Sequence, residues 1–235
     1  QELLHNELVD FQTYQTSYSC LGLPYDLGMQ AEVQKVVAKK LSFNPMLLVV
    51  IGIGGSSLGT KAVYSALRSR YNHKDLIPIL FLETVDPDYS RMVMQKVESV
   101  LQKGAAVIVN VVTKSGTTLE TLTNFECVLD LLKQHRPHDY QELVVVTTDA
   151  DSPLALRAAQ EHFTLLTVPK NVGGRFSVFS TVGLFPLALS GIDIYQLCAG
   201  ARALTEDQEM QALTSALIQW EQYQKGVRVS DLFLF

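Results

Sequence analysis

The chain has 235 residues, of which 47% are hydrophobic and 18% are charged. This composition is typical of a globular protein with a substantial core, and it excludes disorder as the main state. The formal net charge is −5, with 19 basic against 24 acidic residues and no basic block. Nucleic acid and anionic membrane surfaces are therefore not expected as main partners.

The three cysteines are odd in number, widely spaced and without metal-ligand spacing: Cys20, Cys127 and Cys198. Reduced thiols in a cytoplasmic protein are the simplest interpretation. No signal-peptide pattern opens the chain, and no apolar run reaches the roughly 18 residues that a membrane span needs. We therefore expect a cytoplasmic protein that does not insert into membranes.

Residues 1–44 are predicted to form a helical extension. Ala31–Lys40 is an amphipathic helix in this region, with Val33, Val36 and Val37 on one face. We expect this face to pack on the domain that follows.

From residue 45 the pattern becomes α/β, because strands that are apolar throughout alternate with helix-length segments. The expected strands are Leu47–Ile51, Ile77–Leu82, Ala105–Val112, Leu143–Thr147 and Thr164–Val168. The expected helices between them are Leu58–Ser69, Tyr89–Gln102, Leu119–Gln134 and Pro153–His162. This alternation predicts a doubly wound, mostly parallel five-stranded sheet with flanking helices over residues 45–192.

After the last of these strands the chain becomes helical again. A glycine-rich turn, Asn171–Ser177, precedes an apolar helix at Thr181–Ser190, and further helices are expected near Ile194–Leu204 and Asp207–Gln224. Val227–Phe235 is predicted to be a buried strand. We assign residues 193–235 to a helical connection and the first strand of a truncated second domain, and expect the natural chain to continue.

The first candidate site is the turn at Gly52–Gly59, GIGGSSLG, which follows a buried strand. Glycines there let a ligand approach the backbone, and the next helix offers free N–H donors. A dinucleotide fingerprint fits poorly, because Ser57 stands at its third glycine position, although Glu83 could act as the ribose-binding acid. A turn that needs glycine only for its shape is the other alternative.

The second turn, Thr113–Thr118 (TKSGTT), is a sharper signal. Hydroxyls, the Lys114 ammonium and a flexible glycine lie together between a strand and a helix, which suits a phosphate monoester. The alternative is structural, with Thr117 as the N-cap residue and Glu120 completing a capping box. Both interpretations can hold, because capping uses few of these donors.

Arg175 is the third candidate, presented from a glycine turn where it could stabilise a developing oxyanion. A surface salt bridge is its alternative role. The five histidines have no spacing typical of a catalytic triad or a metal site: His5, His73, His135, His138 and His162. The sequence indicates neither a metal nor a cofactor.

Three motifs in this order resemble the glucose-6-phosphate isomerase family of the sugar-isomerase (SIS) superfamily: Ile51–Gly59 (IGIGGSSLG), Thr113–Thr121 (TKSGTTLET) and Val172–Ser177 (VGGRFS). The resemblance covers residues from about 45 to 190. It implies an SIS-type, flavodoxin-like domain. It also implies the reversible isomerisation of glucose 6-phosphate and fructose 6-phosphate, in glycolysis and gluconeogenesis, through a cis-enediol(ate). No cofactor or metal is implied, and a homodimer is expected for the full-length enzyme.

The resemblance also implies roles for individual residues. The family's substrate-binding positions match Gly55, Ser56, Thr113, Lys114, Ser115, Thr117, Thr118 and Glu120. Gly55 and Ser56 would line the sugar pocket, residues 113–118 would hold the phosphate, and Glu120 would lie near the sugar hydroxyls. Arg175 matches the arginine associated with the enediol(ate) intermediate.

The sequence departs from the family pattern in two ways. Ser57 stands where many relatives have Asp, and Thr113 where many have Ser, but both positions stay polar. The family's base glutamate, ring-opening histidine and a further lysine match no residue up to Phe235. We therefore expect this chain to bind sugar phosphate without catalysing. A non-catalytic SIS regulatory module is the alternative, and Ser57 disfavours a third possibility, a nicotinamide-dependent oxidoreductase domain.

Overall fold

The computed structural model describes residues 14, 17–68, 76–203 and 206–229. The chain divides into two compact units, residues 1–198 and 199–235. The division falls inside helix α9 (Ile194–Arg202), beyond the boundary predicted at residue 192, and α10 (Glu206–Gln224) belongs to the second unit. The strand predicted from Val227 is absent over residues 227–229, and residues 230–235 lie outside the described ranges.

The first unit is built on one five-stranded sheet. Its strands are β1 (Pro45–Ile51), β2 (Ile79–Leu82), β3 (Ala106–Val112), β4 (Val144–Thr148) and β5 (Thr164–Thr167). They are ordered β2-β1-β3-β4-β5, and every neighbouring pair is parallel. This is the flavodoxin-like order of doubly wound sheets. The predicted fold class is confirmed.

The strands are apolar because both faces of the sheet are covered. All residues of β3 and β4 are buried, and so are all residues of β1 except Met46. Strands buried on both sides lose the alternation of polar and apolar residues that half-exposed strands show. This is why runs of mainly apolar residues, without alternation, located the sheet correctly.

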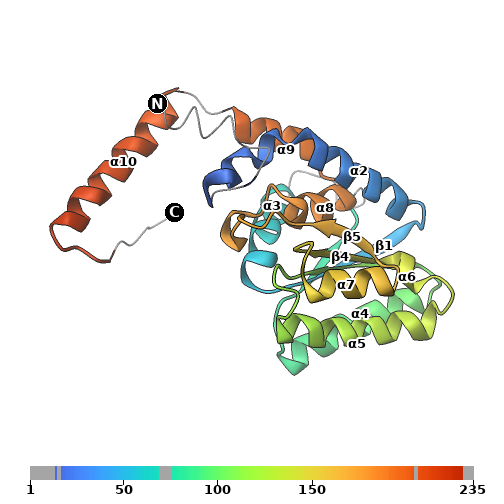
Figure 1. Ribbon diagram of the computed structural model, residues 1–235. Helices are drawn as coiled ribbons and strands as arrows, with labels where there is room; N and C mark the ends of the chain where they lie inside the picture. The colour runs from blue at the N-terminus through green and yellow to red at the C-terminus, as the bar shows by residue number, and fades with distance from the viewer. Residues whose placement is uncertain (1–13, 15–16, 69–75, 204–205, 230–235) are drawn as a thin grey trace. The chain divides into compact units, whose positions relative to one another are not determined.

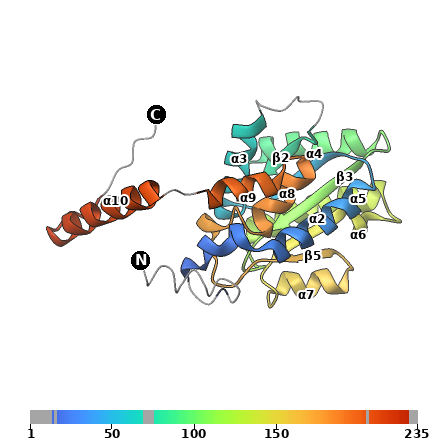
Figure 2. The same cartoon turned by 90° about the horizontal axis from the view of Figure 1, so that it is seen from above.

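Helices cover the two faces of the sheet (Figure 1). One face carries α4 (Pro87–Leu101), α5 (Leu119–His135) and α7 (Pro153–Gln160). The other carries α2 (Leu27–Leu41), α3 (Leu58–Arg68) and α8 (Thr181–Ser190), with α2 and α8 side by side (Figure 2). Shorter helical segments are η1 (Ser17–Tyr25), η2 (Gly54–Ser56), α6 (Tyr140–Leu143) and η3 (Gly174–Phe176).

The innermost helix is α8, in which every residue is buried. A helix that is apolar on all sides is stable in water only when other elements surround it. Here α2, α3 and β1 do so. The helix ends at Gly191, whose φ of 108° is readily accessible only to glycine.

The described part of the N-terminal extension belongs to the first unit. Val33 and Val37 of α2 are buried in the main core, and Val36 packs against it. Lys40 near the end of α2 is also fully buried, and its ammonium donates to the carbonyl of Glu142 at 2.5 Å and to the Thr164 hydroxyl at 2.7 Å. The positions of Val33, Val36 and Val37 confirm the apolar face predicted for this helix.

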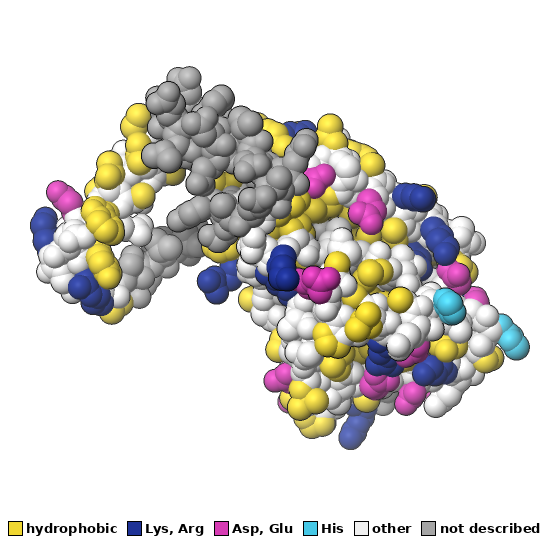
Figure 3. Space-filling model, in the orientation of Figure 1, with side chains coloured by type: hydrophobic (Ala, Val, Ile, Leu, Met, Phe, Trp, Pro, Cys, Tyr) yellow, Lys and Arg dark blue, Asp and Glu magenta, His cyan; other side chains and the backbone are white. Residues whose placement is uncertain are grey.

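The surface carries charges of both signs. On the face shown in Figure 3, the described basic and acidic side chains are interspersed. Within the described ranges, no helix is both long enough and apolar enough to cross a membrane.

Candidate functional site

The three sequence motifs meet at the carboxyl edge of the sheet. The first follows β1, the second follows β3, and the third follows β5. β1 and β3 are neighbours in the sheet, so the first two loops leave it side by side. A Cβ atom placed on Gly52 would lie 2.7 Å from the carbonyl oxygen of Val112, which shows how closely the ends of the two strands approach. Ligands of doubly wound sheets bind at this edge.

The first and third motifs are in direct backbone contact. A Cβ atom on Gly55 would lie 2.4 Å from the carbonyl carbon of Gly174, so η2 packs on η3 without room for a side chain. The Ser177 hydroxyl reinforces this contact, 2.7 Å from the carbonyl oxygen of Gly174 and 3.2 Å from that of Gly55. Gly55 and the adjacent Ser56 are both partly exposed beside this contact.

The second motif gathers its hydroxyl groups on one side of the loop. The Thr113 oxygen lies 2.9 Å from the Thr118 oxygen and 3.4 Å from the Ser115 oxygen. The Thr117 hydroxyl donates to the Ser115 oxygen at 3.2 Å. Thr113 is buried, whereas Ser115 and Thr117 are exposed. A phosphate could therefore exchange these mutual hydrogen bonds for bonds to its own oxygens.

The helix that follows this loop, α5, begins without a side-chain capping hydrogen bond. The N-cap residue of α5 is Thr118, not Thr117, and its hydroxyl makes no capping hydrogen bond. The capping box proposed for Thr117 is therefore wrong, because the Thr118 hydroxyl turns toward Thr113. The first N–H groups of α5 have no partner within the helix and add a partial positive charge. Glu120 is exposed in this first turn.

Lys114 connects the second motif to the third. Its ammonium nitrogen donates to the carbonyl oxygen of Val172 at 2.9 Å. The sequence predicts that this ammonium adds positive charge at a bound phosphate. In the structure the same charge holds two loops together.

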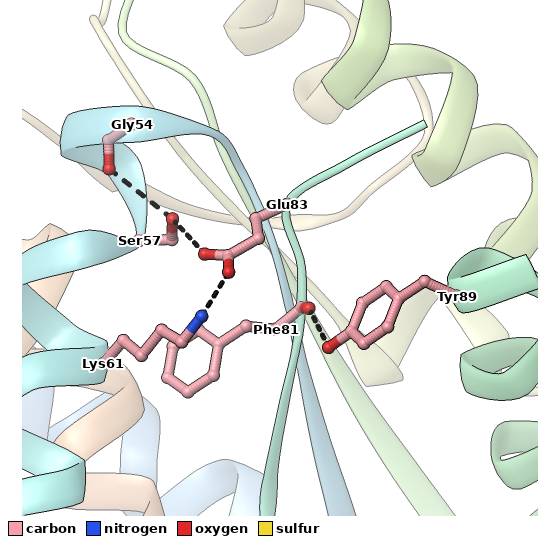
Figure 4. Close-up of polar contacts among 6 residues, drawn as sticks. All are labelled: Gly54, Ser57, Lys61, Phe81, Glu83 and Tyr89. Atoms are coloured by element: carbon pink, nitrogen blue, oxygen red, sulfur yellow. Dashed lines mark hydrogen bonds and ion pairs between the residues drawn. The ribbon is translucent and has the colours of Figure 1, made fainter. Parts of the chain in front are cut away.

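Ser57 turns away from the open edge. It is fully buried, and its hydroxyl lies 3.2 Å from a carboxylate oxygen of Glu83, which follows β2 (Figure 4). The other carboxylate oxygen of Glu83 pairs with Lys61 of α3, and this hydrogen bond raises the pKa of Lys61 above its ordinary value. Glu83 therefore stabilises the first turn, because its carboxylate contacts both Ser57 and Lys61.

Arg175 is exposed on η3, and its guanidinium carbon lies 5.9 Å from the centre of the Phe176 ring. Such a contact between a cation and an aromatic ring contributes about 0.5–1 kcal/mol at an exposed site. Among the side chains that the structure describes, none forms an ion pair with Arg175. The surface salt bridge considered for it is therefore not formed within the described ranges.

Two hydroxyl residues outside the motifs also contact the second loop. The Thr148 hydroxyl donates to the carbonyl oxygen of Thr113 at 2.6 Å and lies 2.8 Å from the Ser152 oxygen. Neither residue was among the site residues predicted from the sequence. The signal was present, because Thr148 ends β4 at the same edge of the sheet, where polar residues that follow apolar strands are candidates for a site.

A cavity of about 590 Å³ opens near the end of β5, and none of the predicted site residues lines it. Its lining includes four acidic residues and one lysine: Asp26, Glu32, Asp149, Asp151 and Lys170. An acidic lining disfavours a phosphate. Over the described ranges, no group of three or more His, Cys, Asp or Glu side chains could hold a metal ion.

Comparisons with known proteins agree with the motifs. A family model described as phosphoglucose isomerase matches residues 38–216. A glucose-6-phosphate isomerase from Thermus thermophilus is 38% identical over 191 residues, which cover 77% of this chain and 42% of that protein. The Bacillus cereus enzyme is 34% identical over 227 residues, covering 90% and 49%. The crystal structure of a hypothetical protein from T. thermophilus superposes with a TM-score of 0.75 at 30% identity, over 94% of this chain and 53% of that one. The chain thus spans about half the length of the curated relatives that it matches.

Proposed function

The chain belongs to the phosphoglucose isomerase family, and we propose that it supplies the phosphate- and sugar-binding part of a glucose-6-phosphate isomerase. The reaction would be the reversible interconversion of glucose 6-phosphate and fructose 6-phosphate through a cis-enediol(ate). The cytoplasm would be its compartment and a homodimer the form of the full-length enzyme.

The convergence of hydroxyls in the second loop carries this proposal. The hydroxyl oxygens of Thr113, Ser115 and Thr118 lie 2.9 to 3.5 Å from one another. They are placed at the N-terminus of α5, a helix of 17 residues. Hydroxyl donors and free helical N–H groups are the groups that bind phosphate oxygens in proteins. Lys114 adds positive charge from within the loop while it also donates to the backbone of the third motif.

The neighbouring loops would hold the rest of the substrate. Gly55 and Ser56 would line the sugar, and Glu120 would accept hydrogen bonds from sugar hydroxyls. Arg175 would stabilise the negative charge of the enediol(ate), for which its exposed guanidinium, without an ion pair among the described side chains, is suited. Moving a proton between C1 and C2 also requires a positioned base. No residue of this chain matches the family's base, so the chain by itself should bind without isomerising.

Calorimetric titration and an isomerase assay test this proposal together. We expect the chain to bind glucose 6-phosphate and to bind unphosphorylated glucose far more weakly, because the loop selects the phosphate. Turnover should be undetectable beside the T. thermophilus enzyme. Failure to distinguish the two sugars would refute phosphate recognition, and substantial turnover would show that the chain contains its own base.

The second candidate, a non-catalytic sugar-phosphate-binding SIS module, makes the same prediction for binding. The two differ in the natural full-length product of the gene. That product should isomerise glucose 6-phosphate if the first proposal is right, and should only bind it if the second is right.

A further inference from the structure

We propose that Thr148 and Ser152 are positioning residues that set the shape of the phosphate loop, residues 113–118, without touching the ligand. Neither lies in any of the three motifs: Thr148 ends β4 and Ser152 is the N-cap residue of α7. This inference rests on the proposed function, because the loop is taken to bind phosphate.

The hydrogen bonds that join these residues to the loop can run in only one direction. The carbonyls of Thr113 and Lys114 can only accept, and the Thr148 hydroxyl lies 2.6 Å from the first and 3.4 Å from the second, so it donates its single proton to Thr113. Thr148 must then accept from Ser152 at 2.8 Å, and the Ser152 oxygen accepts the N–H of Ala155 at 3.1 Å. Each bond in such a chain polarises the next. The N-terminus of α7 is thereby linked to the backbone of the loop.

Because Thr148 and Ser152 are buried, water cannot easily replace the hydrogen bonds that they make. Thr148 is fully buried, and Ser152 is only 5% exposed. The Thr113 carbonyl accepts a further hydrogen bond from the Gly116 N–H at 3.2 Å, which closes the turn of the loop. Without the Thr148 hydroxyl, the carbonyl would keep only that longer bond, and water could reach it only if the surrounding structure opened.

The loop also packs directly on the start of α7. Gly116 has a φ of +68°, and a Cβ atom there would lie 2.8 Å from the Cβ of Ser152 and 2.9 Å from the nitrogen of Leu154. Ser152 therefore packs against the turn of the loop at Gly116, and its hydroxyl donates to Thr148.

The position of the Thr113 carbonyl has a consequence for ligand binding. In a planar trans peptide, the C=O and the following N–H point in opposite directions. A Thr113 carbonyl held against Thr148 therefore turns the Lys114 N–H away from the β4–α7 turn, where a ligand can meet it. Without the hydrogen bonds from Ser152 to Thr148 and from Thr148 to Thr113, this peptide could rotate. The Lys114 N–H would then be misplaced as a donor of the loop.

Three substitutions at neighbouring threonines test the proposal. Thr148→Val keeps the shape and removes the hydroxyl, Thr148→Ser restores it, and Thr147→Val is a matched control. Thr147 is also buried in β4, but its hydroxyl accepts from the side-chain amide of Asn110 at 2.8 Å instead of contacting the loop. Thr148→Val should bind both glucose 6-phosphate and inorganic phosphate roughly tenfold more weakly. Thr148→Ser and Thr147→Val should bind like the wild type. Wild-type affinity in Thr148→Val, or an equal loss in Thr147→Val, would overturn the proposal.

Amide hydrogen exchange at Gly116 gives a readout that does not need a ligand. Thr148→Val should speed exchange of this N–H relative to amides of β1, while Thr147→Val should not. Unchanged exchange at Gly116 would refute the positioning role. If the wild-type chain binds neither probe, the proposed function is wrong, and the exchange measurement still decides whether Thr148 shapes the loop.

Discussion

The ammonium nitrogen of Lys114 lies 2.9 Å from the carbonyl oxygen of Val172, although 58 residues separate them in the sequence. The contact ties the loop after β3 to the loop that carries Arg175. Lys114 is only partly exposed. Its charge therefore has a structural use in the free protein, in addition to any attraction that it exerts on a phosphate.

Lys114→Met is expected to lower both stability and sugar-phosphate affinity. The hydrogen bond involves a charged donor, so its loss should cost about 1–2 kcal/mol of unfolding free energy. Thermal denaturation and calorimetric titration with glucose 6-phosphate measure the two effects. Lys170→Met is the control, because Lys170 is exposed and its ammonium lies 3.7 Å from Asp151 outside the loops. A loss of affinity with unchanged stability would show that the ammonium serves only the ligand.

Gly55→Ala is expected to separate the first and third motifs. The new methyl carbon would lie 2.4 Å from the carbonyl carbon of Gly174, and backbone atoms cannot swing aside as a side chain can. Overpacking of this kind costs about 1–3 kcal/mol, which corresponds to roughly 2–4 °C in Tm for each kcal/mol. Gly173→Ala is a matched control in the same loop, because its methyl would meet only the Phe176 ring at 3.5 Å. Equal Tm values for the two variants would contradict the close backbone contact.

Ser57→Asp is expected to destabilise this chain because of Glu83. The new carboxylate would be buried beside an existing one, at a cost of roughly 1–3 kcal/mol. Glu83→Gln alone should cost less than about 1 kcal/mol, because its pair with Lys61 is partly exposed. In the double variant, the amide of the glutamine can donate to the aspartate, so the two losses should not add. Chemical denaturation of the four proteins measures this coupling, and simple additivity would disprove it.

Lys40 is expected to make stability depend on pH. Burial, followed by the neighbouring Lys39, lowers the pKa of Lys40 from 10.5 to about 8, against the attraction of Glu142. Between about pH 8 and 10.5 the unfolded chain therefore binds more protons than the folded one. Unfolding free energy should rise with pH in that window, by at most about 1.4 kcal/mol per pH unit.

Urea denaturation of wild type and Lys40→Met between pH 7 and 9.5 measures this effect. The rise should be present in the wild type and absent in the variant. Measurements stop below pH 10 because burial raises the pKa of Tyr14, which makes the folded state lose stability above that pH. Parallel pH profiles for the two proteins would show that Lys40 does not titrate in this range.

The strands and most of the helices could be predicted because their signals are local. Leu47–Ile51 is a continuous apolar run and Val107–Val112 is apolar except at Asn110, and a parallel sheet buried on both faces requires such runs. The start of α5 was harder to predict. Thr117 and Thr118 are equivalent in type, so the sequence does not tell which of them is the cap residue. In the structure it is Thr118, whose hydroxyl lies 2.9 Å from that of Thr113 instead of capping the helix.

The three motifs, their order and their place after β1, β3 and β5 follow from the sequence alone. The doubly wound fold then brings the ends of parallel strands to one edge. The partners of individual side chains do not follow in this way. Lys114 meets Val172, Ser57 meets Glu83 and Thr148 meets Thr113 across gaps of 58, 26 and 35 residues. Such contacts depend on how separate loops pack at the sheet edge, and no local pattern encodes them. Tertiary structure therefore decides which polar residues remain open to a ligand and which ones hold the loops in place.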